Sequence, residues 1–206
     1  MSRLPPSVLL LGGCVVLGAG VGMLLVGDVG SDGFSTLVNG LARASGMPFW
    51  AANLLVACGF LGVASARRVR PGWGSVTQIV LVGFVVTVVL SVLPRPEGWA
   101  GRIAMVAAAF PVLAAGIAAY LGSHSGAGPA EAAALAWDPP IPFRWSYNLV
   151  QGVSALVGWL LGATVGPGTI AVVVLLGPLI DLASRLLRLE VHQGAVAPSP
   201  SDRRPS

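Results

Sequence analysis

Long apolar segments constrain the fold of this chain more than any other feature of its sequence. A helix that crosses the hydrocarbon core of a bilayer needs roughly 20 consecutive, mostly apolar residues. Stretches of that kind recur along the whole chain and predict an all-α membrane protein with about six transmembrane helices. The predicted spans are Val8–Val26, Phe49–Ala66, Ser75–Leu93, Ile103–Leu121, Trp145–Ala163 and Thr169–Leu187.

The composition agrees with a protein that lies in lipid. Apolar residues make up 55% of the 206 residues and charged residues only 10%, whereas soluble domains carry about 25% charged residues. The lipid bilayer is therefore the predicted surroundings of the chain. The net charge of +4 comes from arginines in loops and tails, so no nucleic-acid partner is expected.

Two stretches between the predicted spans are too apolar for free loops and too polar to cross a membrane. They cover residues 27–48 and 122–144, and each begins with glycine. We expect each to be a re-entrant half-helix, which a membrane tolerates where protein covers it or where it lines a cavity. Residues 191–206 are rich in proline, serine and charge and are expected to form a disordered cytoplasmic tail.

The arginines predict the orientation of the chain. Arg67, Arg68 and Arg70 form the densest cluster, and cytoplasmic loops carry an excess of basic residues. If that loop is cytoplasmic, six spans place both termini in the cytoplasm. Of the 12 basic residues, only those at positions 43, 95 and 102 then lie outside.

The two halves of the chain resemble each other. A shift of 95 residues aligns Trp50 with Trp145 and Asn53 with Asn148. This Trp-x-x-Asn pattern is informative because the chain contains only three asparagines, the third being Asn39. We therefore predict two repeats, over residues 1–95 and 96–190.

The predicted repeats must have opposite orientations in the membrane. Each contains three spans and one half-helix, and an odd number of crossings reverses the direction of the second copy. Inverted repeats of this kind occur in many secondary transporters, which bind solutes near the membrane midplane at broken helices. We expect the half-helix at 27–48 to enter from outside, the one at 122–144 to enter from inside, and their tips to meet.

Several glycine motifs resemble the YczE/YyaS/YitT family of bacterial multi-pass membrane proteins. They are Gly126–Pro129, Gly72–Ser75, Gly166–Thr169 and Gly177–Asp181, and the resemblance covers roughly residues 8–188. It implies an inner-membrane, transporter-like protein without an assigned substrate. The first half departs from the pattern, since Thr87 takes the place that Asp181 has in the second half.

Ionisable residues inside a membrane are costly, and by default they mark functional sites. Glu131 is the clearest candidate, as a ligand for a cation or a carrier of a proton. Its alternative role is structural, because an acidic side chain near a helix N-terminus is stabilised by the dipole. Asp181 is a second candidate for binding, although it could simply pair with Arg185 one turn later.

Amides within the predicted spans form a further group of candidates for substrate binding. Asn53, Asn148 and Gln151 belong to it, with Gln78 as a weaker member. Hydrogen bonding between helices is the alternative role for all of them. Asp28 and Asp32 are expected to be exposed to water, with Asp32 as a possible helix cap.

The sequence contains no pattern typical of catalysis. We find no His, Cys, Asp and Glu cluster with metal-ligand spacing, no nucleophile elbow and no phosphate-binding loop. We therefore expect no enzyme, cofactor or metal. The leading hypothesis is a small permease for an unknown solute or ion, and the alternative is a scaffold for an unidentified protein partner or a lipid. Half-helix tips that converge on a polar cavity at the midplane would favour transport, and tips that are packed dry would favour the scaffold.

Overall fold

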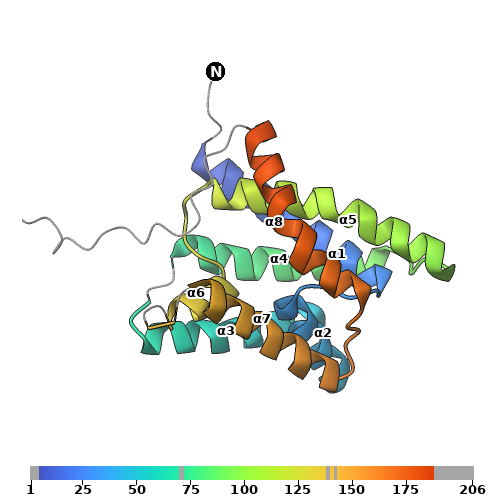
Figure 1. Ribbon diagram of the computed structural model, residues 1–206, viewed down its shortest axis with the longest axis horizontal. Coiled ribbons are helices and arrows are strands. Elements are labelled where there is room, and N and C mark those ends of the chain that lie inside the picture. Colours follow the sequence, from blue (N-terminus) through green and yellow to red (C-terminus); the bar gives the residue numbers. More distant parts are fainter. Residues whose placement is uncertain (1–4, 70–71, 138–139, 142, 188–206) are drawn as a thin grey trace, which may run out of the picture.

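The computed structural model describes residues 5–69, 72–137, 140–141 and 143–187, and this part of the chain forms eight α-helices without a strand (Figure 1). The predicted tail at 191–206 lies outside the described residues. The helices are α1 Pro6–Gly27, α2 Gly33–Ser45, α3 Phe49–Ala66, α4 Trp73–Val92, α5 Gly98–Leu121, α6 Pro129–Leu135, α7 Phe143–Leu160 and α8 Pro167–Leu187.

Four of these helices are long and apolar enough to cross a membrane, namely α1, α3, α4 and α5. Helix α8 would be a fifth if its two parts, Pro167–Leu176 and Pro178–Leu187, are counted as one span. The two parts are bent by 46° relative to each other at the break before Pro178. A proline inside a helix removes a hydrogen bond and bends the axis. Helix α7 does not reach the apolarity of a span, since its first half contains polar residues such as Asn148 and Gln151. The structure thus supports a membrane protein with four to five apolar spans.

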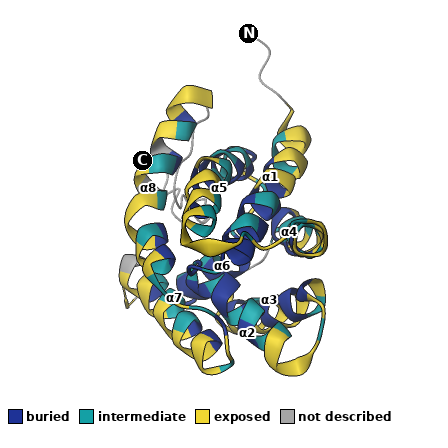
Figure 2. Cartoon of the chain, turned by 90° about the vertical axis from the view of Figure 1, so that its right-hand side faces the viewer, coloured by how far each residue is buried: buried dark blue, intermediate teal, exposed yellow. Residues whose placement is uncertain are grey.

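Helix α1 lies at the centre of the arrangement. It packs against α5 on one side and against α4 on another, while α8 packs against α5. The short helix α2 contacts α7 and α3, and the short helix α6 contacts α3 and α7. Figure 2 shows buried residues along the inward sides of these helices and exposed residues on their outer faces.

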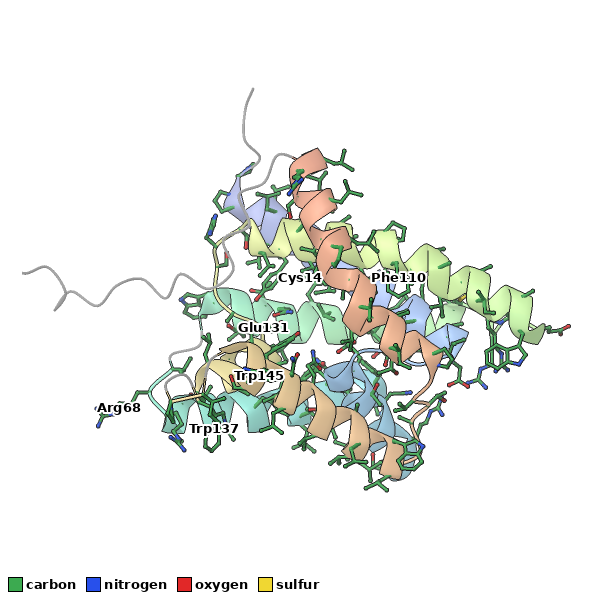
Figure 3. All side chains as sticks on the ribbon, in the orientation of Figure 1. Cys14, Arg68, Phe110, Glu131, Trp137 and Trp145 are labelled. Carbon is green, nitrogen blue, oxygen red and sulfur yellow. The ribbon has the colours of Figure 1, made fainter. Side chains whose placement is uncertain are left out.

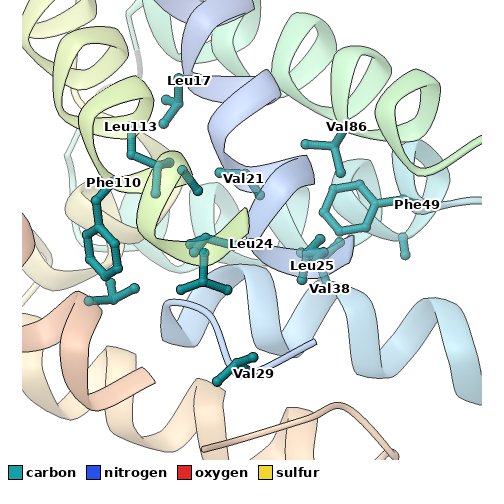
Figure 4. Close-up of a cluster of buried hydrophobic side chains, with 14 of the residues drawn as sticks. Leu17, Val21, Leu24, Leu25, Val29, Val38, Phe49, Val86, Phe110 and Leu113 are labelled. Carbon is teal, nitrogen blue, oxygen red and sulfur yellow. The ribbon is translucent and has the colours of Figure 1, made fainter. Parts of the chain in front are cut away.

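The interior is apolar around α1 and the helices that cover it. Leu24, Val38, Phe49, Val86 and Phe110 are among the buried side chains of this core (Figure 4). Large apolar side chains are also exposed on the outer faces, with Trp73 at 87% and Val173 at 71%. Water would disfavour such a surface, whereas a bilayer accommodates it.

Small residues allow α1 and α5 to pack closely. A side chain at Gly13 would collide with backbone atoms of Tyr120, and one at Gly116 would collide with backbone atoms of Leu17. Close backbone approach through glycine is typical of helix packing in membranes.

Two extended segments lead back from the ends of α1 and α5 to the short helices. In the first, the Val29 carbonyl accepts a hydrogen bond from the Gly168 N–H at 3.0 Å. In the second, the Ser125 carbonyl accepts one from the Gly74 N–H at 2.9 Å. A side chain at either glycine would collide with the segment, so the Gly-x-Gly-Ser/Thr motifs permit this close contact.

Both short helices cover less of the chain than the sequence indicated. Helix α2 has 13 residues, since Gly27 still belongs to α1 and residues 28–32 are not helical. Helix α6 has seven residues, and Pro129 is its first, where a missing N–H costs nothing. Apolarity alone did not separate these helices from the extended segments before them.

Candidate functional site: a polar centre between α2 and α6

The N-terminus of α2 is fixed by its own polar residues. Asp32 Oδ2 accepts a hydrogen bond from the Ser35 N–H at 3.0 Å, as expected of a helix cap. The Thr36 hydroxyl donates to the Asp32 carbonyl at 2.7 Å. These bonds hold the partly buried Asp32 carboxylate at the start of the helix instead of leaving it in open water.

Gln151 connects this N-terminus to α7. The Phe34 N–H donates to Gln151 Oε1 at 2.9 Å, and Gln151 Nε2 donates to the Tyr147 hydroxyl at 2.8 Å. A side chain at Gly33 would collide with the Gln151 backbone, so glycine brings α2 and α7 into contact here. Gln151 thus makes the interhelical hydrogen bond that was the alternative to substrate binding.

Glu131 lies in the first turn of α6, facing residues of α4. A side chain at Gly128 would collide both with Glu131 Oε2 and with the Gln78 amide, which places these two groups beside each other. Gln78 Oε1 is buried and accepts no hydrogen bond within the described part of the chain. Figure 3 shows Glu131 toward the middle of the molecule, well inside Arg68 at its edge.

The two carboxylates influence each other. Burial raises the pKa of Asp32 above its ordinary value, and this outweighs the hydrogen bonds from Ser35. Burial also raises the pKa of Glu131, and the nearby Asp32 charge raises it further. Neither residue belongs to one of the spanning helices. Both carboxyl groups are therefore poised to hold a proton more readily than in water.

Two tyrosines complete the surroundings of Glu131. The Glu131 carboxylate is close enough for its charge to act on the hydroxyls of Tyr120 and Tyr147. The Tyr120 hydroxyl donates to the Gly126 carbonyl at 2.6 Å, in the segment that leads to α6. The sequence analysis missed both tyrosines. Tyr147 could have been found, because it lies four residues before Gln151 on the same face of α7.

These residues form one cluster, which we call the polar centre: Asp32, Gln78, Glu131, Tyr147 and Gln151. It combines two protonatable carboxyl groups, two amides and a hydroxyl where the N-termini of α2 and α6 converge. Such a set can bind a cation or a polar solute, or pass a proton. No group of three metal-ligating side chains occurs among the described residues.

The other predicted binding residues lie elsewhere. Asn53 is buried in α3 and donates to the Ile79 carbonyl of α4 at 2.7 Å. Asn148 is exposed on α7. The backbone of Asp181 belongs to α8, and its side chain lies outside the described part of the structure. The polar centre therefore includes Glu131 and Gln151 from the predicted set.

Asp28 is a correction to the sequence analysis, which expected it in water. Its side chain is only 14% exposed and pairs with Arg43 at 3.1 Å and Arg95 at 2.7 Å. The Thr164 hydroxyl donates to the same carboxylate at 2.5 Å. Asp28 therefore links α2 to the connections before α5 and before α8. The sequence could not show this, because these partners are 15, 67 and 136 residues away along the chain.

Comparisons with known proteins give a family but no activity. A family model described as "Family of unknown function (DUF6198)" matches residues 6–185. An uncharacterised protein of Haemophilus influenzae is 26% identical over 181 residues, which cover 86% of this chain and 82% of the relative. No solved structure matches the chain. The resemblance to the YczE/YyaS/YitT family is not confirmed by these matches.

Proposed function

This chain belongs to the family of unknown function DUF6198, so its role must be inferred from its own residues, and we propose that it is a small membrane permease. One observation carries the proposal. Gln151 of α7 bonds both to Tyr147 and to the N-terminus of α2, which Asp32 caps. Glu131 in the first turn of α6 lies beside the Gln78 amide. A polar, ionisable cluster is costly inside a membrane protein, and solute or proton pathways are its commonest use.

The contacts between helices support two inverted repeats. The packing of α1 on α4 corresponds to that of α5 on α8, and the packing of α2 on α7 corresponds to that of α6 on α3. The hydrogen bonds from Gly74 to Ser125 and from Gly168 to Val29 correspond in the same way. In this proposal α7 and α8 are the fifth and sixth spans, and α2 and α6 are re-entrant.

The same architecture supports an orientation. The first turn of α1, the connection after α3 and the start of α7 lie toward one end of the molecule in Figure 1. Placing this end in the cytoplasm satisfies the excess of arginines there. We infer a bacterial inner-membrane protein with both termini in the cytoplasm. Labelling by a membrane-impermeant thiol reagent tests it: a cysteine at exposed Ser45 should react from outside and one at exposed Ser65 only after permeabilisation.

Glu131 supplies the proposed coupling. Gln78 Oε1 is buried and has no hydrogen-bond donor among the described residues, and the Glu131 carboxylate, a further acceptor, lies near the same amide. Two such groups lie together favourably when the carboxyl is protonated or when a cation lies between them. We therefore infer that solute movement is coupled to a proton or a cation at Glu131.

A transport assay tests the proposal. Purified protein is reconstituted in proteoliposomes that contain a pH-sensitive dye, a pH gradient is imposed, and amine, amino-acid, sugar and organic-acid panels are added. We expect at least one panel to give protein-dependent flux that Glu131→Gln reduces at least tenfold. Glu97→Gln is the matched control, because Glu97 is exposed at the start of α5 and its side chain makes no capping bond.

Two results would overturn the permease. One is the absence of protein-dependent flux for every panel from a folded preparation. The other is full activity in Glu131→Gln with a working solute, which would remove the polar centre from the mechanism.

A membrane scaffold is the second candidate, and the position of Asn148 favours it. This amide is exposed on α7 together with the neighbouring Trp145 and Leu149, whose exposures are 58% and 61%. An amide that faces lipid without a partner is unfavourable, so a second protein could cover this face. Co-purification of one stoichiometric partner, lost in Asn148→Leu, would support the scaffold, and a monodisperse monomer would count against it.

A further inference from the structure

A pocket lies away from the polar centre, at the end of the molecule where α1 and α4 end. It has a volume of about 290 Å³, near the lower end of the range for small-molecule sites. Its lining comes from α1, α2, α4 and the connection after α4. The lining residues are Leu25, Val26, Asn39, Arg43, Leu90, Leu93 and Arg95.

The charges around this pocket do not balance. Arg43 and Arg95 both line it, and both pair with the single carboxylate of Asp28. Asp28 also accepts from Thr164, so its two oxygens already serve three donors. Among the described residues, one of the two positive charges is therefore left without an anion of its own. The two arginine side chains are 39% and 50% exposed, so they are open to a ligand at the pocket.

The rest of the lining indicates what kind of anion would fit. Four aliphatic residues contribute to the lining, although its exposed surface is more polar than apolar, and the Asn39 amide makes no hydrogen bond within the described part of the chain. Arginine presents a planar set of donors that matches a carboxylate. A small organic acid would place its carboxylate near the arginines and Asn39 and its short body against the aliphatic part of the lining.

We propose that this arginine pocket binds a small carboxylate with an apolar body, whose charge is held by Arg43 and Arg95. The pocket opens beside the outer connections of the proposed topology, so it would receive solute before the polar centre does. This role as an entry site rests on the proposed permease. The binding itself does not, and a binding measurement tests it separately.

Thermal unfolding of the purified protein in detergent, followed by tryptophan fluorescence, measures this binding with benzoate as the probe. A ligand that binds only the folded state raises the unfolding midpoint. We expect benzoate well above its Kd to raise the midpoint by about 3–5 °C. Benzyl alcohol, and chloride at equal ionic strength, should give less than a third of that shift.

Two variants, each with a control variant, test whether benzoate binds at the arginine pocket. Leu90→Trp fills the pocket but keeps both arginines, and it should abolish the benzoate shift. Its control, Leu54→Trp on the exposed face of α3, should keep the shift. Arg95→Gln should reduce the shift at least threefold, measured against the variant's own midpoint, while Arg68→Gln at the other end should not.

The benzoate measurements test ligand binding at the arginine pocket and do not depend on transport. No benzoate shift in the wild type, an equal shift with benzyl alcohol or chloride, or an undiminished shift in Leu90→Trp would each overturn the proposal. The shift should also persist in Glu131→Gln, and its loss there would assign the binding to the polar centre instead. Transport can fail while the benzoate shift is present, so the two proposals fail separately.

Discussion

At the residue scale, glycine decides how closely the helices approach one another. Gly116 of α5 lies against the backbone of α1, where an added Cβ would meet Leu17 N and Val16 C. Backbone atoms cannot move aside as a flexible side chain can. Gly59 of α3 offers a contrast, since nothing lies within 4 Å of an added Cβ. The same residue type is therefore essential at one position and replaceable at the other.

The substitution Gly116→Leu is expected to lower the free energy of unfolding by about 1–3 kcal/mol, because overpacking forces α1 and α5 apart. Gly59→Leu should change it by less than about 0.5 kcal/mol. Thermal unfolding in the same detergent compares the two variants. Equal midpoints for both would contradict the close packing of α1 on α5.

Sequence patterns singled out two residues of the polar centre but not their partners. Glu131 and Gln151 could be singled out because acids and amides are rare in apolar segments. The bond from Phe34 to Gln151 joins positions 117 residues apart, and it depends on where the segment at 28–32 places α2. Asn53 and Asn148 are equivalent in the sequence, yet one is buried and the other exposed. Only tertiary packing separates them.

At the scale of the element, α2 shows how a short helix is held inside an apolar protein. Its N-terminus is capped by Asp32, and Gly46 in the left-handed conformation, with φ 72°, follows its last residue. Glycine adopts this conformation without steric cost. Hydropathy predicted a half-helix within residues 27–48, between the first and second predicted spans. It could not give the ends, because the whole connection at 27–48 was predicted as one half-helix, including the extended segment at 28–32 with its two aspartates.

The cap leads to a prediction about pH. Because the pKa of Asp32 is raised in the folded protein, the native state binds more protons than the unfolded state above the ordinary value of about 3.9. Stability contributed by Asp32 therefore falls as the pH rises from that value toward the raised pKa, and is constant above it. In Asp32→Asn the cap acceptor remains but this pH dependence is lost. The difference between unfolding midpoints at pH 4 and pH 8 should shrink.

Two controls separate the charge from the cap. Glu97→Gln should leave the pH profile unchanged, since Glu97 is exposed. Asp32→Ala removes the acceptor for the Ser35 N–H and should cost a further ~1 kcal/mol at every pH. A pH profile of Asp32→Asn identical to that of the wild type would contradict a raised pKa.

At the scale of the whole molecule, the two halves have related contacts but differ in one place. Asn53 of α3 is bonded to α4, and an added Cβ at Gly83 would lie 3.4 Å from the Asn53 Cβ. The corresponding residues of the second half are Asn148 and Gly177, and Asn148 is exposed. Composition predicted a helical membrane protein, and the repeat in the sequence stays a prediction that the helix contacts support. They could not predict this asymmetry, since the two halves carry the same residues here.

The asymmetry predicts a second conformation. Carriers built from inverted repeats alternate by moving one part against the other around a fixed site, and exchange of the two conformations would bring Asn148 against Gly177. In a chain with Cys14→Ala and Cys58→Ser, the pair Asn53→Cys/Gly83→Cys should form a disulfide rapidly on mild oxidation, because 3.4 Å is close to the Cβ separation of a disulfide. The pair Asn148→Cys/Gly177→Cys should form one more slowly, as the second conformation is visited. Mass spectrometry of digests counts both bonds.

In a chain with all four cysteines, each molecule should contain one bond or the other, since the conformations exclude each other. Molecules that contain both bonds, or a 148–177 pair that never forms, would contradict the exchange.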